Sequence, residues 1–320
     1  MTICLCQLSA LECLREASAS SWSLSPLPRR AALAFIPCAR EVKQLESLGC
    51  GFLSKPLYLL VANAADRRKI KGTVCRLCPS DVASCSILVT RGGLLTEGPQ
   101  LCFLHRASEL TLPLLVEMGF ELCGSYRIYP ADPKGFLERA PLTSRSQLIR
   151  FVEGVCGAKG GARAKRAMVF VRDGSRSPME TIVVMLLCLS PWYGGYGLPM
   201  PHLNYRVNVS RNARKASANG YYLCDAFWPE ALLDVEYDSD LAHTGSTRIS
   251  HDAKRLNGLI SMGITVITVT REQVLDCDEM DKVAHAVAQR LDRRLRLGGK
   301  GWIRRRAELR RQLLDFSRPH

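Results

Sequence analysis

The stretch from Cys224 to Asp238, CDAFWPEALLDVEYD, carries the strongest fold signal in the C-terminal half of this chain. The turn-forming residues Trp228-Pro229-Glu230-Ala231 separate two short apolar runs, and this predicts two strands joined by a turn. In the second run, apolar and acidic side chains alternate, as in a strand that has one apolar and one charged face. The alternating residues are Leu233, Asp234, Val235, Glu236, Tyr237 and Asp238.

The acidic residues of this hairpin predict a metal site. Antiparallel partners have residue numbers with a constant sum, so a hairpin centred near residue 230 sets Asp225 across from Glu236. Carboxylates on neighbouring strands repel one another unless a cation joins them. The pattern therefore predicts a hard divalent cation, Mg²⁺ or Mn²⁺, held by Asp225, Glu236 and Asp238.

The segments around the hairpin predict an α-β-β-β-α-β unit. A helix should begin at Ser177 and end near Ser190. The three strands are expected at 205–209, 221–227 and 232–238, followed by a helix at 249–262 and an apolar, β-branched strand at 264–270. A strand that follows a crossover helix should lie parallel in the same sheet.

The rest of the chain gives a mixed α/β fold with four segments. The 320 residues are enough for two cores. We expect a helix at 41–48, buried strands at 56–62 and 86–90, and helical spacing of apolar residues over 103–120. The predicted segments are a mixed α/β N-terminal domain (1–128), a basic linker or helical connector (129–174), the α-β-β-β-α-β domain (175–278) and basic C-terminal helices (279–320).

The formal charge of +14 favours a polyanion partner, most often nucleic acid. A solvated basic surface without a partner has the same composition. In the connector, four cations have no acidic residue between them to offset their charge. They are Lys159, Arg163, Lys165 and Arg166.

The 14 cysteines are scattered, and most lie in apolar runs, which predicts reduced thiols and a cytoplasmic protein. The longest apolar run, Thr181 to Leu189, is too short to span a bilayer, so no membrane partner is expected. Cys75 and Cys78, with Cys85 nearby, have zinc-like spacing, but a structural zinc site would require a second ligand pair.

Residues of the hairpin carry a resemblance to a known family. The chain resembles the very-short-patch-repair-like family of unknown function within the PD-(D/E)XK restriction-endonuclease-like superfamily, over roughly 175–275. The matching hairpin positions are Asp225, Trp228, Pro229, Glu230, Ala231, Leu233, Val235, Glu236, Tyr237 and Asp238. Ser177-Pro178-Met179-Glu180 is similar to the family's first helix. Residues 56–126 are similar to AbiEi-like type IV antitoxins.

This resemblance implies a nuclease-like site and a DNA-binding surface. The implied catalytic residues are Glu180, Asp225, Glu236, Asp238 and Lys254, and His251 and Arg255 are implied to contact nucleic acid. The chain departs from the superfamily at Asp238, which replaces the lysine of Glu-x-Lys. A cation would then come from Lys254 or Arg255, and a proton carrier from His243 or His251.

Each residue also has a structural interpretation. Ser177 and Glu180 fit a capping box, the acidic strand face fits a charged sheet edge, and the histidines and Lys254 fit exposed surface. The resemblance implies a Mg²⁺-dependent deoxyribonuclease, which is the first hypothesis for this chain. The alternatives are a non-catalytic DNA-binding regulator or antitoxin with a possible toxin partner, and a protein-binding module.

Overall fold

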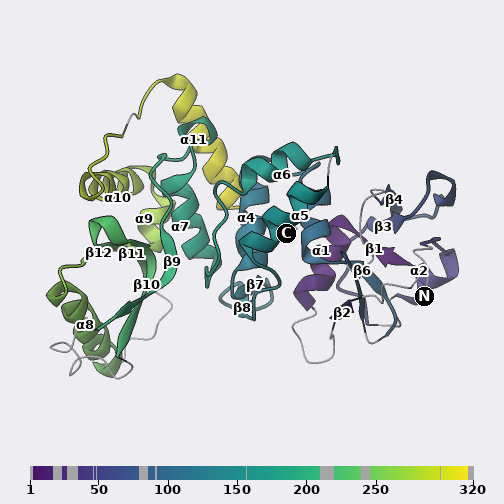
Figure 1. Cartoon of the computed structure of the whole chain (residues 1–320), viewed down its shortest axis with the longest axis horizontal. Coiled ribbons are helices and arrows are strands. Elements are labelled where there is room, and N and C mark those ends of the chain that lie inside the picture. The colour runs from purple at the N-terminus through teal and green to yellow at the C-terminus, as the bar shows by residue number, and fades with distance from the viewer. Residues whose placement is uncertain are drawn as a thin grey trace.

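The structure is a computed structural model that describes most of the chain. It describes residues 3–16, 24–26, 35–45, 47, 49–78, 86–90, 92–155, 157–209, 220–238, 246–295 and 297–315, with side chains omitted for 24 and 246–253. In Figure 1 the N-terminal sheet, a central group of helices and the C-terminal sheet follow one another along the long axis. Among the described residues no helix has the length and hydropathy to cross a bilayer.

The N-terminal sheet is mixed, with the strand order β2-β5-β6-β1-β3-β4. Its strands are β1 (Cys4–Leu5), β2 (Leu24–Pro26), β3 (Leu57–Val61), β4 (Thr73–Leu77), β5 (Ile87–Thr90) and β6 (Leu95–Glu97). Two helices accompany it, α1 (Gln7–Glu16) and α2 (Ala39–Gln44). The predicted strands at 56–62 and 86–90 are confirmed as β3 and β5. Part of the helix expected at 41–48 is present as α2, and residues 46 and 48 lie outside the described residues.

Helices form the central part. They are α3 (Pro99–Arg106), α4 (Leu112–Cys123), α5 (Arg145–Gly154) and α6 (Gly161–Ala167), with the small hairpin β7 (Tyr126–Ile128) and β8 (Phe136–Glu138) below α4 in Figure 1. The apolar spacing over 103–120 therefore belongs to two helices. A new helix begins after Thr111, with Pro113 in its first turn, and it continues past Gly119 to Cys123.

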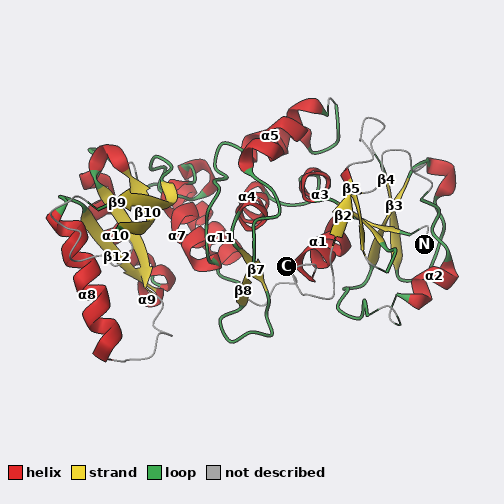
Figure 2. Cartoon of the chain, turned by 60° about the horizontal axis from the view of Figure 1, so that its bottom comes forward, coloured by secondary structure: helices red, strands yellow, loops and turns green. Residues whose placement is uncertain are grey.

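The C-terminal sheet has the order β12-β11-β10-β9. Its elements follow the chain as α7 (Pro178–Cys188), β9 (His202–Asn208), β10 (Tyr221–Trp228), β11 (Leu233–Asp238), α8 (Ser246–Ser261) and β12 (Thr265–Thr270). β10 pairs antiparallel with β9 and β11, and β12 lies parallel to β11 after the α8 crossover. The mixed α/β class is confirmed. Figure 2 shows α8 at the end of the molecule far from the N-terminal sheet.

Three further helices complete the fold: α9 (Arg271–Leu275), α10 (Cys277–Arg290) and α11 (Lys300–Leu313). Helix α11 packs back against α4, α7 and the short 3₁₀ turn Pro191–Tyr193. Some of its arginines have structural roles. Arg306 forms an ion pair with Asp281 (2.5 Å), and the buried Arg310 donates to the carbonyl oxygen of Val274 (2.5 Å).

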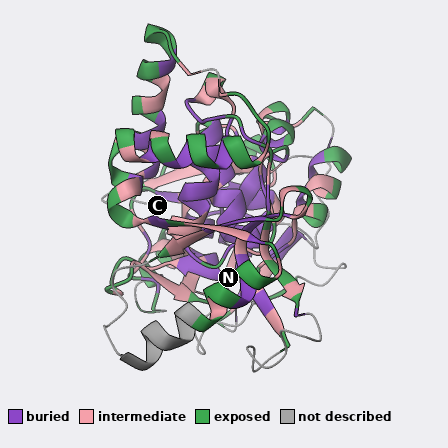
Figure 3. Cartoon of the chain, turned by 90° about the vertical axis from the view of Figure 1, so that its left-hand side faces the viewer, coloured by how far each residue is buried: buried purple, intermediate pink, exposed green. Residues whose placement is uncertain are grey.

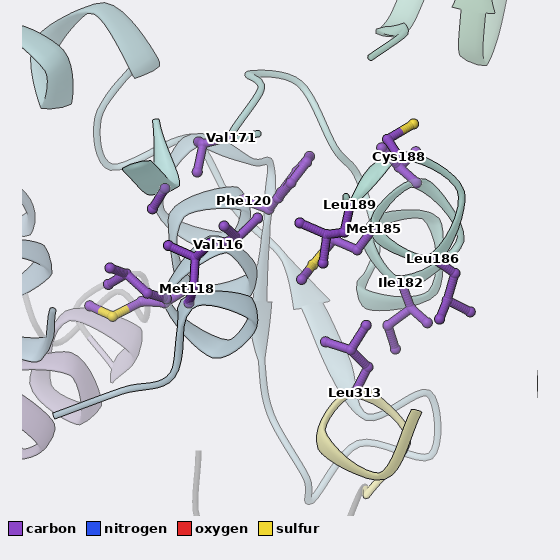
Figure 4. Packing of buried hydrophobic residues seen from close by; sticks show 14 of the residues in the cluster. Val116, Met118, Phe120, Val171, Ile182, Met185, Leu186, Cys188, Leu189 and Leu313 are labelled. Atoms are coloured by element: carbon purple, nitrogen blue, oxygen red, sulfur yellow. The ribbon is translucent and has the colours of Figure 1, made fainter. Parts of the chain in front are cut away.

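The largest hydrophobic core joins residues from the whole length of the chain. Leu11 of α1, Val152 of α5, Ile182 of α7 and Leu313 of α11 belong to one buried cluster. Figure 4 shows Phe120 of α4 beside α7 in this cluster, and Figure 3 shows buried residues at the centre and exposed faces on the outer helices. The four predicted segments thus share a core, and their independence as folding units stays a prediction.

Gly119 gives a first test of this packing. A Cβ at Gly119 would lie 2.5 Å from Cγ2 of Val171 and 3.2 Å from Phe103, and both side chains are fully buried. We expect Gly119→Ala to lower the free energy of unfolding by about 1–3 kcal/mol, because overpacking outweighs the gain in helix propensity. The matched control is Gly154→Ala at the end of α5, where a Cβ meets no atom within 4 Å. Urea unfolding measures both variants, and equal changes in their unfolding free energies would contradict overpacking at Gly119.

Candidate functional site

Glu180 is held at the first turn of α7. Ser177 precedes the helix, and its hydroxyl accepts the amide N–H of Glu180 (3.2 Å) and donates to Glu180 Oε1 (3.0 Å). Glu180 Oε2 accepts the Arg176 amide (3.0 Å) and the side-chain amide of Asn204 (3.1 Å). The structural interpretation of Glu180 as a capping residue is therefore confirmed in part. Burial still raises the pKa of Glu180, against these hydrogen bonds.

Asp225 lies on the same side of the sheet as Glu180. Both carboxylates line a cavity of about 10 Å³, with Tyr237, Val183, Val184, Ala226 and Val235 as the other walls. Asp225 Oδ2 accepts the backbone N–H of Tyr237 (3.2 Å). Burial, and then the charges of Glu180 and Glu236, raise the pKa of Asp225 to about 7. A cavity of this size holds one water-sized particle.

The predicted pairing of Asp225 with Glu236 needs a correction. The β10–β11 register has the expected sum, with Ala226 opposite Val235, but the recorded ladder stops at that pair. On the next strand Asn204, level with Asp225 in the β9–β10 register, has a left-handed backbone (φ 44°). The regular pleat is interrupted here, so Asp225 faces α7 while Glu236 does not.

Glu236 points toward α8, where Arg255 neutralises it. Arg255 Nη1 donates to Glu236 Oε2 (2.6 Å), and Arg255 Nη2 lies 2.5 Å from Glu236 Oε1. Arg255 also donates to the carbonyl oxygen of Leu223. Of the two cations proposed from the sequence, Arg255 contacts an acid, whereas Lys254 is exposed. Arg255 was expected to contact nucleic acid, and its guanidinium is instead engaged within the protein.

Asp234 is a buried acid that the site prediction omitted. Its exposure is 0%, and neither carboxylate oxygen accepts a hydrogen bond from a described residue. Its polar neighbours are Glu236 and the thiol of Cys224. Burial, followed by interaction with Glu236, raises the pKa of Asp234 to about 9. The alternation with Glu236 and Asp238 was the signal that could have identified it. Asn204, also missed, had no such signal.

The remaining predicted site residues lie apart from this cluster. Asp238 is exposed at the end of β11. The side chain of His251 and all of His243 lie outside the described residues. The expected edge-strand interpretation does not fit β11, which is an inner strand between β10 and β12.

The connector cations divide into two kinds. Arg163 is partly buried and donates to the carbonyl oxygens of Ala107 (2.9 Å) and Leu110 (2.8 Å), so it ties α6 to the end of α3. Lys159, Lys165 and Arg166 are exposed. Those three side chains are available to a phosphate, whereas Arg163 has a structural role.

The described residues fit a divalent cation only in part. Among them, no group of three or more His, Cys, Asp or Glu side chains is arranged to hold a metal ion. The predicted set of Asp225, Glu236 and Asp238 therefore does not converge. Glu180 and Asp225 do share one small cavity, and two carboxylates are a donor set that Mg²⁺ accepts when water or substrate completes its shell.

Cys75 and Cys78, which have zinc-like spacing, both line one pocket, and Cys85 lies outside the described residues.

Comparisons of the chain with protein-family models, curated proteins and solved structures found no match. The likeness to restriction-endonuclease-like nucleases and to AbiEi-like antitoxins thus rests on the sequence positions alone.

Proposed function

We propose that this protein is a divalent-cation-dependent nuclease that hydrolyses phosphodiester bonds in DNA. The observation that carries the proposal is the pairing of Glu180 and Asp225 in one ion-sized cavity, with the pKa of each carboxyl raised. Two acids that repel each other in a partly apolar cavity are stabilised when a cation binds between them. The positions come from the first helix and the second strand of the unit, as the resemblance expects.

Hydrogen bonds from neighbouring residues fix both carboxylates of this site in place. Asn204, Ser177 and the Arg176 amide fix the Glu180 carboxylate, and the Tyr237 amide fixes that of Asp225. Mg²⁺ or Mn²⁺, when bound, would activate water and stabilise charge on a phosphate. Glu236 and Asp238 have no part in this two-carboxylate site. The exposed cations Lys165 and Arg166 offer contacts to the DNA backbone.

Calorimetric titration with Mn²⁺, alongside nicking of supercoiled DNA, tests the proposal. We expect Asp225→Asn and Glu180→Gln each to weaken Mn²⁺ binding at least about tenfold and to abolish nicking, since each removes one of two charged ligands. Binding in the wild type should strengthen as pH rises through about 7, where Asp225 loses its proton. Asp238→Asn is the matched control and should bind as the wild type does. Nicking that survives in Asp225→Asn would overturn the assignment.

A second candidate is a DNA-binding regulator that lacks cleavage activity. The observation that favours it is the ion pair of Glu236 with Arg255. This pair neutralises the carboxylate that the resemblance assigns to the metal site. On this view the wild type shifts DNA in a gel without metal and does not nick it with Mg²⁺ or Mn²⁺. An antitoxin role with a toxin partner would belong to this candidate.

A further inference from the structure

A large pocket lies far along the chain from the acidic site. Its volume is about 640 Å³, within the range of sites for small molecules. Its walls come from the start of α1, strand β4, the end of α3 and the connection between α5 and α6. We call it the β4–α3 pocket. It is lined by Gln7, Arg67, Cys75, Arg76, Leu77, Cys78, His105, Ser108, Glu109, Val155, Gly157, Ala158 and Lys159.

Cations dominate the charged lining of the β4–α3 pocket. Arg67, Arg76 and Lys159 carry permanent charge, and Glu109 is the acid among the lining residues. That acid is itself neutralised, because Arg76 Nη2 lies 3.0 Å from one of its oxygens and Arg106 Nη1 lies 3.0 Å from the other. The pocket therefore has a surplus of positive charge, and a ligand with several negative charges would relieve it.

Buried hydrogen bonds hold the pocket side chains in place. Glu97, fully buried behind the pocket, accepts the backbone N–H of Gln7 (3.0 Å) and contacts the ring of His105. Gln7, itself buried, accepts from Arg76 Nε (3.0 Å). Burial alone would lower the pKa of His105, but the charge of Glu97 and its hydrogen bond outweigh burial and raise it above the ordinary value. Preorganised donors cost less to order when a ligand binds.

The lining also limits what the ligand can be. Arginine and lysine recognise phosphate oxygens, and arginine does so with two parallel donors. Leu77, Val155 and Ala158 give the pocket an apolar portion beside its cations. A ligand that matches both the cations and the apolar portion has a phosphate group and a flat or apolar body of moderate size.

We propose that the β4–α3 pocket binds a nucleoside phosphate, with Arg67, Arg76 and Lys159 on the phosphate and the apolar wall against the base. The nucleotide can be a free molecule or the terminal unit of a nucleic-acid strand, since both present the same group. The pocket shares no residue with Glu180 and Asp225, so this proposal is independent of the nuclease assignment.

Calorimetry on the full chain at low salt, without added metal, tests the pocket with two probes. These are ATP and a short 5′-phosphorylated single-stranded DNA. We expect saturable binding of at least one probe, weakened about tenfold by Arg67→Gln and by Lys159→Gln, since each removes a charge that contacts phosphate. Binding of ATP indicates a free nucleotide, and binding of the oligonucleotide alone indicates a strand end.

The matched control is Lys134→Gln, which removes the same charge from an exposed position between β7 and β8, outside the β4–α3 pocket. It should change binding of either probe by less than about twofold, because it alters only the long-range electrostatic attraction, which salt screens. Equal weakening by Lys134→Gln and Lys159→Gln, or no saturable binding of either probe to the folded wild type, would overturn the proposal. Far-ultraviolet circular dichroism of each variant confirms that the fold is retained.

Discussion

Replacement of Arg255 by methionine is expected to lower the free energy of unfolding by about 2–4 kcal/mol. The substitution leaves the Glu236 carboxylate charged beside Asp234, and it removes the donor to the carbonyl oxygen of Leu223. Removal of one partner from a buried ion pair is costly because the other charge stays desolvated. The side chains of Arg255 and Glu236 are 26% and 17% exposed, so the loss should be smaller than for a fully buried pair.

The neighbouring residue supplies the control for this measurement. Lys254→Met removes an exposed charge from the same helix and should change the unfolding free energy by no more than about 0.5 kcal/mol. The double variant Arg255→Met with Glu236→Gln should recover part of the loss, because the stranded charge is gone. Urea unfolding of the wild type, Arg255→Met, Glu236→Gln and the double variant gives the coupling energy. A loss below about 1 kcal/mol for Arg255→Met would show that the pair is solvated and that Glu236 is free to take another partner.

The strands of the C-terminal sheet were predictable because their signals are local. Alternation over 233–238 and the Trp-Pro turn at 228–229 specify a hairpin whatever surrounds it, and β10 and β11 have nearly the expected bounds. The helical interpretation of 103–120 was confirmed for most of the stretch but missed the break between α3 and α4, because apolar periodicity continues across that break. There the boundary is set by Thr111 and Pro113.

The site was less predictable because it depends on which way each side chain faces. Arg255 and the fully buried Leu259 are one helical turn apart, so Arg255 faces the sheet, but Leu256 (39% exposed) and Ile260 (56% exposed) suggest the wrong face from sequence alone. Asp225 lies at a break in the β9–β10 ladder, level with Asn204 (φ 44°), and no residue pattern predicts this break. Asp234 is fully buried on β11, an inner strand between β10 and β12, and that position depends on pairing with strands on both sides.

Substitution of Asp234 by asparagine is expected to stabilise the protein more at pH 8 than at pH 6. In the unfolded chain this carboxyl loses its proton near pH 4, whereas in the folded protein burial and Glu236 raise its pKa to about 9. Between these values the folded state holds the extra proton, so the contribution of Asp234 to stability is complete below pH 4 and is lost as pH rises toward 9. Asparagine does not titrate, and its amide group is a donor toward Glu236 at every pH.

The size of this effect follows from the proton difference. Each pH unit costs the wild type about 1.4 kcal/mol for one proton, so the gain of Asp234→Asn over the wild type should grow by roughly 3 kcal/mol from pH 6 to pH 8. Urea unfolding at both pH values measures it. Asp238→Asn, an exposed position on the same face of β11, is the matched control and should show no such growth. If both variants shift equally, Asp234 is ionised in the folded state and another cation must lie beside it, because a fully buried carboxylate is not stable unpaired.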